Sequence, residues 1–106
     1  MLRVMTMRRD ARELAVPPTA AVDAEAIEIL RAWVTKGNLE VGLIRAWDQP
    51  DPWGVLLVDL ARHAARAFAQ EGICTESDAL ERIRALFNAE WDRPTDIGST
   101  QQVTKQ

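Results

Sequence analysis

The chain has one cysteine, one histidine and no tyrosine among its 106 residues. A single cysteine excludes an intramolecular disulfide, and one cysteine with one histidine argues against a four-ligand zinc site. We therefore expect no metal and no other cofactor. No apolar run approaches the roughly 18 residues of a membrane-spanning helix, and no export signal is present. The sequence thus predicts a cytoplasmic protein without membrane contact.

Positive charge is also in short supply. Thirteen Lys and Arg stand against 16 Asp and Glu, giving a net charge of -3, so whole-chain electrostatics do not favour nucleic-acid binding. Residues 1–22 have four arginines among the first twelve positions and a Pro-Pro pair at Pro17-Pro18. They are expected to be an arm that is partly extended or disordered. A compact domain is expected over residues 23–94, followed by a disordered polar tail over residues 95–106.

Residues 27–46 fit two structures. Apolar residues at positions 27, 30 and 34 have helical spacing, whereas Gly37-Asn38 between two apolar runs is typical of a β-hairpin loop. The β-branched content favours the hairpin. With that loop, one face of the sheet is almost wholly apolar. The predicted cross-strand neighbours are Val34 with Val41, Ala32 with Leu43, Trp33 with Gly42, and Thr35 with Glu40.

A long amphipathic helix is predicted over residues 52–70. Asp51 suits its N-cap, Pro52 its first position and Gly72 its stop. Spacings of three and four residues predict that one face is buried. The residues of that face are Trp53, Leu56, Leu57, Leu60, Ala64 and Phe68.

A last helix is predicted from a cap at Thr75 to Pro94. Its apolar residues Leu80, Ile83, Phe87 and Trp91 predict a second buried stripe. The predicted fold class is α+β: a small single domain in which a β-hairpin is followed by two amphipathic helices packed on it.

The hairpin segment, Trp47 and the run Trp53–His63 together resemble a small bacterial family, Domain of Unknown Function 5076. The resemblance covers roughly residues 13–94 and implies a single-domain bacterial protein without an assigned activity. Members often carry a histidine in the second strand, followed by Arg-Pro. Here that region reads Leu39-Glu40-Val41-Gly42-Leu43-Ile44-Arg45, so a site built on that histidine would be lacking.

Asp59 and His63 are four residues apart on the predicted helix, so a pocket between sheet and helices could use them, with Arg31 as a third polar group. No nucleophile motif accompanies them. We therefore expect a solvated stripe with helical salt bridges, and we predict no catalytic, cofactor-binding or metal-binding residue. The residues of that stripe are Asp59, Arg62, His63, Arg66 and Gln70.

The chain has four tryptophans, and Trp33 and Trp47 are the two without a clear place in a helix stripe. Trp33 falls on a hairpin face that is too apolar to stay wet. Two alternatives would cover the hairpin: Leu14–Val16 as a third strand, or a second subunit paired at the strand edge across a two-fold axis. The leading hypothesis is a non-enzymatic interaction or structural module that is a homodimer. The alternative is a small-molecule-binding or catalytic protein that uses Asp59 and His63.

Overall fold

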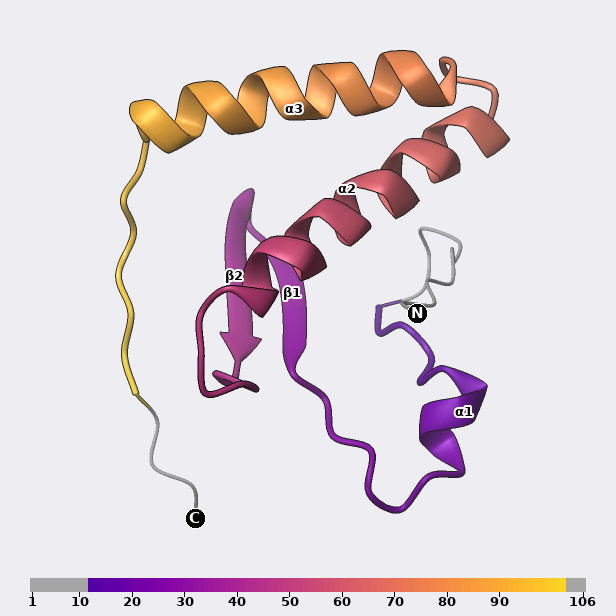
Figure 1. Cartoon of the computed structure of the whole chain (residues 1–106), viewed down its shortest axis with the longest axis vertical. Helices are drawn as coiled ribbons and strands as arrows, with labels where there is room; N and C mark the ends of the chain where they lie inside the picture. Colours follow the sequence, from indigo (N-terminus) through magenta and orange to yellow (C-terminus); the bar gives the residue numbers. More distant parts are fainter. Residues whose placement is uncertain (1–11, 103–106) are drawn as a thin grey trace. The chain divides into compact units, whose positions relative to one another are not determined.

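The computed structural model describes residues 12–102, and three of the four arginines in the predicted arm, Arg3, Arg8 and Arg9, lie outside the described residues. The elements follow in the order α1 (Pro18–Ala21), β1 (Leu30–Thr35), β2 (Asn38–Leu43), α2 (Pro52–Gln70) and α3 (Glu76–Asp92), as Figure 1 shows. The predicted α+β class is confirmed. The chain divides into two units, one ending at Leu60 and the other beginning at Ala61, and each is described in turn.

The first unit contains the hairpin of β1 and β2, which pair antiparallel. The hairpin interpretation of residues 27–46 is therefore confirmed, and the helix interpretation is wrong. The turn is formed by Lys36 and Gly37, whose φ values are +52° and +81°. Positive φ at both central positions is the mark of a type I′ turn, whose right-handed twist matches that of the strands.

The predicted loop of Gly37 and Asn38, and the pairings derived from it, are wrong. Trp33 lies opposite Glu40 rather than Gly42, and Thr35 lies opposite Asn38. The observed register brings Leu39 into the ladder, so it forms three apolar cross-strand pairs where the predicted register forms two. Those pairs are Leu30 with Leu43, Ala32 with Val41, and Val34 with Leu39.

One face of the hairpin is apolar, as predicted, because the register differs from the predicted one by two residues. A shift of two leaves every side chain on its original face, whereas a shift of one would reverse them all. We call this surface the apolar hairpin face. Its six residues are Leu30, Ala32, Val34, Leu39, Val41 and Leu43.

Helix α2 begins at Pro52 and ends at Gln70, as predicted. Gly72 follows with φ +73°. The backbone N–H of Gly72 donates to the carbonyl of Ala69, and that of Ile73 donates to the carbonyl of Phe68. These two bonds form a Schellman motif, which satisfies carbonyls that the end of the helix leaves without partners.

In the second unit, α3 is capped by Thr75. Its Oγ1 accepts a hydrogen bond from the backbone N–H of Asp78 at 3.1 Å, as the sequence predicts. Acidic residues in the first turn complement the positive end of the helix dipole. Arg66 of α2 and Glu76 of α3 lie 3.7 Å apart as an ion pair.

Burial is slight throughout the described residues, where the buried apolar residues are Ala65 and Ala79. The predicted α2 stripe is only partly covered: Trp53, Leu56 and Leu60 are half-buried, whereas Leu57, Ala64 and Phe68 are exposed. The predicted α3 stripe behaves in the same way, with Leu80 and Ile83 half-buried and Phe87 and Trp91 exposed. Periodicity identifies the apolar side of a helix but says nothing about what covers it.

The segment before the hairpin contains α1 and adds no strand to the sheet, which has two strands among residues 12–102. Of the two alternatives for covering the hairpin, the one in which Leu14–Val16 forms a third strand is therefore wrong. The segment is joined to β1 by an ion pair instead, in which Arg31 Nη1 lies 2.6 Å from Glu13 Oε2. Within the same residues, no helix has the length and apolar character needed to cross a membrane.

Candidate functional site

The chain makes a tight turn after β2. The backbone N–H of Trp47 donates to the carbonyl oxygen of Arg45 at 2.8 Å, a bond that closes a three-residue γ-turn. Ala46, at its centre, has φ +69°, a conformation that costs a residue with a Cβ about 1–2 kcal/mol. Such strain persists only where neighbouring contacts hold it in place.

Those contacts come from Trp53, in the first turn of α2. Its indole Nε1–H donates to the same Arg45 carbonyl at 2.9 Å. The ring of Trp53 meets the ring of Trp47 edge to face, with centroids 5.9 Å apart and planes at 81°, a geometry favoured by the aromatic quadrupole. Arg45 Nη1 in turn donates to the carbonyl of Trp47 at 2.9 Å. The turn is thereby fastened to the start of α2.

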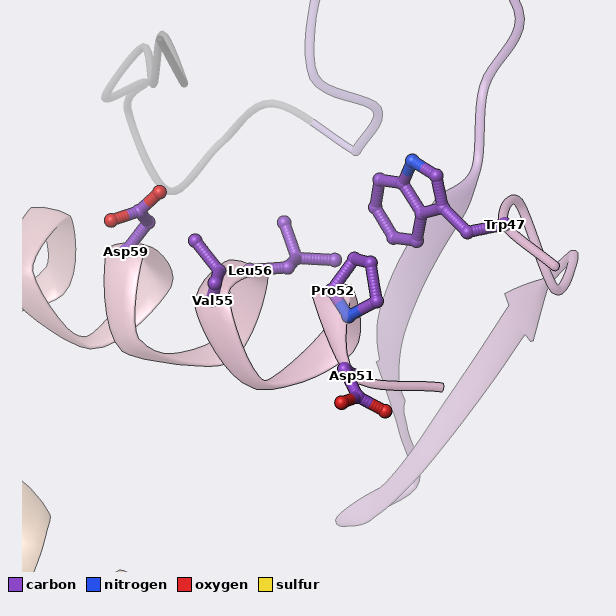
Figure 2. Close-up of a pocket in the computed structure, with 6 residues that line it drawn as sticks. All are labelled: Trp47, Asp51, Pro52, Val55, Leu56 and Asp59. Carbon is purple, nitrogen blue, oxygen red and sulfur yellow. The ribbon is translucent and has the colours of Figure 1, made fainter. Parts of the chain in front are cut away.

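A pocket of about 460 Å³ lies beside this junction. Four of its residues share one face of α2 because they are spaced by three and four positions. Figure 2 shows Val55, Leu56 and Asp59 projecting from the same side of α2, with the Trp47 ring beside Pro52, while the Asp51 carboxylate points away. The lining residues are Trp47, Asp51, Pro52, Val55, Leu56 and Asp59.

The structure separates the two residues that the sequence places together. Asp59 lines the pocket, whereas His63 is not among its lining residues. Both are half-buried, and no ion pair links them among residues 12–102. The predicted ladder of helical salt bridges along α2 is likewise wrong, since Arg66 pairs with Glu76 of α3. Adjacent turns of a helix bring two side chains near each other but do not force them to pair.

Arg31, the third predicted polar group, does not line the pocket and instead forms ion pairs with Glu13 and Glu28. Its guanidinium donates to both carboxylate oxygens of Glu28 and to Glu13. The hydrogen bonds to Glu28, and then those to Glu13, raise the pKa of Arg31 above its usual value. This cation therefore stays charged at every physiological pH, and its donors are occupied by the segment that precedes β1.

Trp33 and Trp47 lie at different places in the first unit. Trp33 faces Glu40 across the hairpin and is 38% exposed, whereas Trp47 lines the pocket. Sequence reasoning named Trp47 but missed Pro52, Val55 and Leu56, although their helical spacing with Asp59 is visible in the sequence. Within residues 12–102, no cluster of three His, Cys, Asp or Glu side chains could hold a metal ion.

A short strained turn, a tryptophan pair and a mainly apolar pocket make up the candidate site of this small α+β protein. The chain belongs to the family described as Domain of unknown function (DUF5076), which matches residues 13–95, so the predicted resemblance is confirmed. The chain is also similar to a solved structure from the photosynthetic bacterium Rhodopseudomonas palustrus, named "putative pyruvate dehydrogenase". The two are 44% identical, with a TM-score of 0.75, over 92% of this chain and 100% of the other. No curated protein matches the chain.

Proposed function

We propose that this chain is a non-enzymatic interaction module that functions as a homodimer. The observation that carries the proposal is the lack of a buried core within residues 12–102, where no large side chain is fully buried. Burying one large apolar side chain stabilises a protein by about 1.5–3 kcal/mol, and folding must offset roughly 1–2 kcal/mol of backbone entropy per residue. Two buried alanines do not provide that stabilisation.

Two apolar surfaces support a protein partner. On the apolar hairpin face, Val34 is 78% exposed and Leu39 is 72% exposed. On α3, Phe87 and Trp91 stack with centroids 5.7 Å apart, and Trp91 is 74% exposed. Exposed aromatic and aliphatic clusters of this kind mark interaction sites. A second copy is the simplest partner, because it carries the same two apolar surfaces and is present wherever this chain is made.

Light scattering of the whole chain tests the proposal, and we expect twice the mass of one chain. Val34→Asp places a charge on the apolar hairpin face and should lower the dimer mass, whereas Thr35→Asp, the neighbouring change on the opposite face, should keep it. Since Val34→Asp could unfold the chain, the wild type supplies a second test. The unfolding midpoint of a dimer rises with protein concentration. A midpoint independent of concentration, or a wild-type monomer, would overturn the proposal.

A second candidate function is small-molecule binding in the pocket at Trp47. The pocket volume falls within the range of about 300–1,000 Å³ typical of ligand sites. Asp59 gives its mainly apolar lining a carboxylate, whereas the carboxylate of Asp51, the other acidic lining residue, points away (Figure 2). Titration with phenylethylammonium, followed by tryptophan fluorescence, should give a saturable change that Asp59→Asn abolishes. An equal response to neutral phenylethanol would remove the role of Asp59. The pyruvate dehydrogenase name of the relative assigns no role to any residue here and does not enter either candidate.

A further inference from the structure

We infer that the two copies join along the outer edge of β2, antiparallel, with the two-fold axis at Val41. The inference rests on the homodimer proposed above and specifies where its strands meet. Edge pairing would give a four-stranded sheet in the order β1, β2, then β2 and β1 of the second copy. A hairpin alone is marginally stable, and two further strands are enough to change that.

The hydrogen bonds of the hairpin determine which backbone groups point outward from β2. The N–H of Ile44 donates to the carbonyl of Ile29 at 3.1 Å. In the observed register these two residues lie opposite each other, so they form a hydrogen-bonded pair. Hydrogen-bonded and non-bonded pairs alternate along an antiparallel ladder. The N–H and C=O groups of Leu39, Val41 and Leu43 therefore point away from β1, toward the outer edge of β2.

Two features distinguish the edge of β2 from that of β1. The ion pair between Arg31 and Glu13 ties the segment that precedes the hairpin to β1. All six residues of β2 are exposed, whereas β1 begins with two half-buried residues. Like β1, strand β2 contains neither proline nor lysine, the residues with which many proteins block an edge against pairing.

Symmetry restricts the register of β2 against its copy. A two-fold axis normal to the sheet keeps each residue on the same face in both copies. Directly opposite residues also share a face, so the axis must lie between one residue and the same residue of the second copy. The largest overlap of Asn38–Leu43 with itself that this permits pairs five residues of each strand and places the axis at Glu40 or Val41. An axis at Glu40 sets two carboxylates directly opposite each other, which is destabilising.

An axis at Val41 avoids this repulsion. Glu40 then lies opposite Gly42 of the second copy, and Leu39 lies opposite Leu43. Val41 meets Val41 of the second copy, and Leu39 meets Leu43, all in hydrogen-bonded positions, so each unpaired amide and carbonyl of these residues gains a partner. The two apolar hairpin faces also lie side by side as one surface.

Cysteine cross-linking tests the register in full-length protein that carries Cys74→Ser. At Val41 the two Cα atoms would lie about 5.5 Å apart, within the range of roughly 4.4–6.8 Å that a disulfide spans. Val41→Cys should therefore form a covalent dimer under mild oxidation. Val34→Cys, which is on the same face but three strands from its equivalent, should not, because the Cα atoms would be at least about 14 Å apart.

Two further cysteine variants test the competing arrangements, a different register and a different strand edge. A cross-link through Glu40→Cys in place of Val41→Cys would overturn the register, and a cross-link through Ala32→Cys would overturn the choice of edge. Light scattering of each reduced variant is measured in parallel. A dimer mass without the Val41→Cys cross-link refutes this inference and leaves the homodimer standing. A monomer mass in the wild type refutes both.

Discussion

The indole N–H of Trp53 and the backbone N–H of Trp47 donate to one acceptor, the carbonyl oxygen of Arg45, at 2.9 Å and 2.8 Å. This shared oxygen ties the start of α2 to the chain that leaves β2. It also holds Ala46 in a conformation with φ +69° that the residue would not adopt alone.

Trp53→Phe keeps an aromatic ring against Trp47 but removes the N–H donor. We expect a loss of about 0.5–1.5 kcal/mol in the free energy of unfolding, the usual net value of one hydrogen bond, measured by urea denaturation. Trp33→Phe is the control, because within residues 12–102 no hydrogen bond involves the Trp33 indole. Equal losses in the two variants would show that ring size, and not the bond to Arg45, sets the effect.

Gly37→Ala tests the turn of the hairpin. An alanine at φ +81° should cost about 1–2 kcal/mol and lower the thermal midpoint. Gly42→Ala is matched to it, because φ is not positive there and an added methyl meets no atom within 4 Å. That variant should keep stability or raise it by up to about 1 kcal/mol, through a smaller unfolded-state entropy. A neutral Gly37→Ala would contradict the type I′ turn.

Ala65→Leu tests the most buried position of the described chain, since Ala65 has no exposed surface. The three added carbon atoms must displace packed neighbours, so we expect a destabilisation of about 1–3 kcal/mol. Ala64→Leu makes the same change at the adjacent exposed position and should change stability by less than about 0.5 kcal/mol. The comparison is made by chemical denaturation at one protein concentration. Similar losses in both variants would place the covered side of α2 elsewhere.

His63→Ala should change the free energy of unfolding by no more than about 0.5 kcal/mol. The imidazole is half-buried, and among the described residues no hydrogen bond or ion pair reaches it. Chemical denaturation of the wild type and the variant measures the difference. A loss of several kcal/mol would reveal a buried, paired histidine and would restore the catalytic alternative.

The sequence predicts local structure well where a residue type suits a particular backbone position, as at the ends of helices. Pro52 at the start of α2, Gly72 after its end, and Thr75 as the cap of α3 are each required by the backbone groups of a helix terminus. The predicted faces of the hairpin are also correct despite the wrong loop, because a register shift of two residues leaves every side chain on its original face.

The sequence does not predict contacts between segments that are distant along the chain or between side chains on neighbouring helical turns. Trp91 has the spacing of a core residue yet is 74% exposed, since the helical period cannot say whether a covering surface lies in the same chain. Asp59 and His63 have the spacing of a pair but form none, because exposed ion pairs have too little net energy to fix a geometry. The register depended on Lys36, a residue with no intrinsic preference for positive φ.

Within residues 12–102 the buried apolar residues are Ala65 and Ala79, so the proposed homodimer would make the folding of each copy depend on the abundance of the others. In a homodimer of such chains, a newly made polypeptide would remain open to proteases until it met a companion, so expression level would set lifetime. Dilution alone would then unfold the molecule, and any relative able to pair with it could also stabilise it.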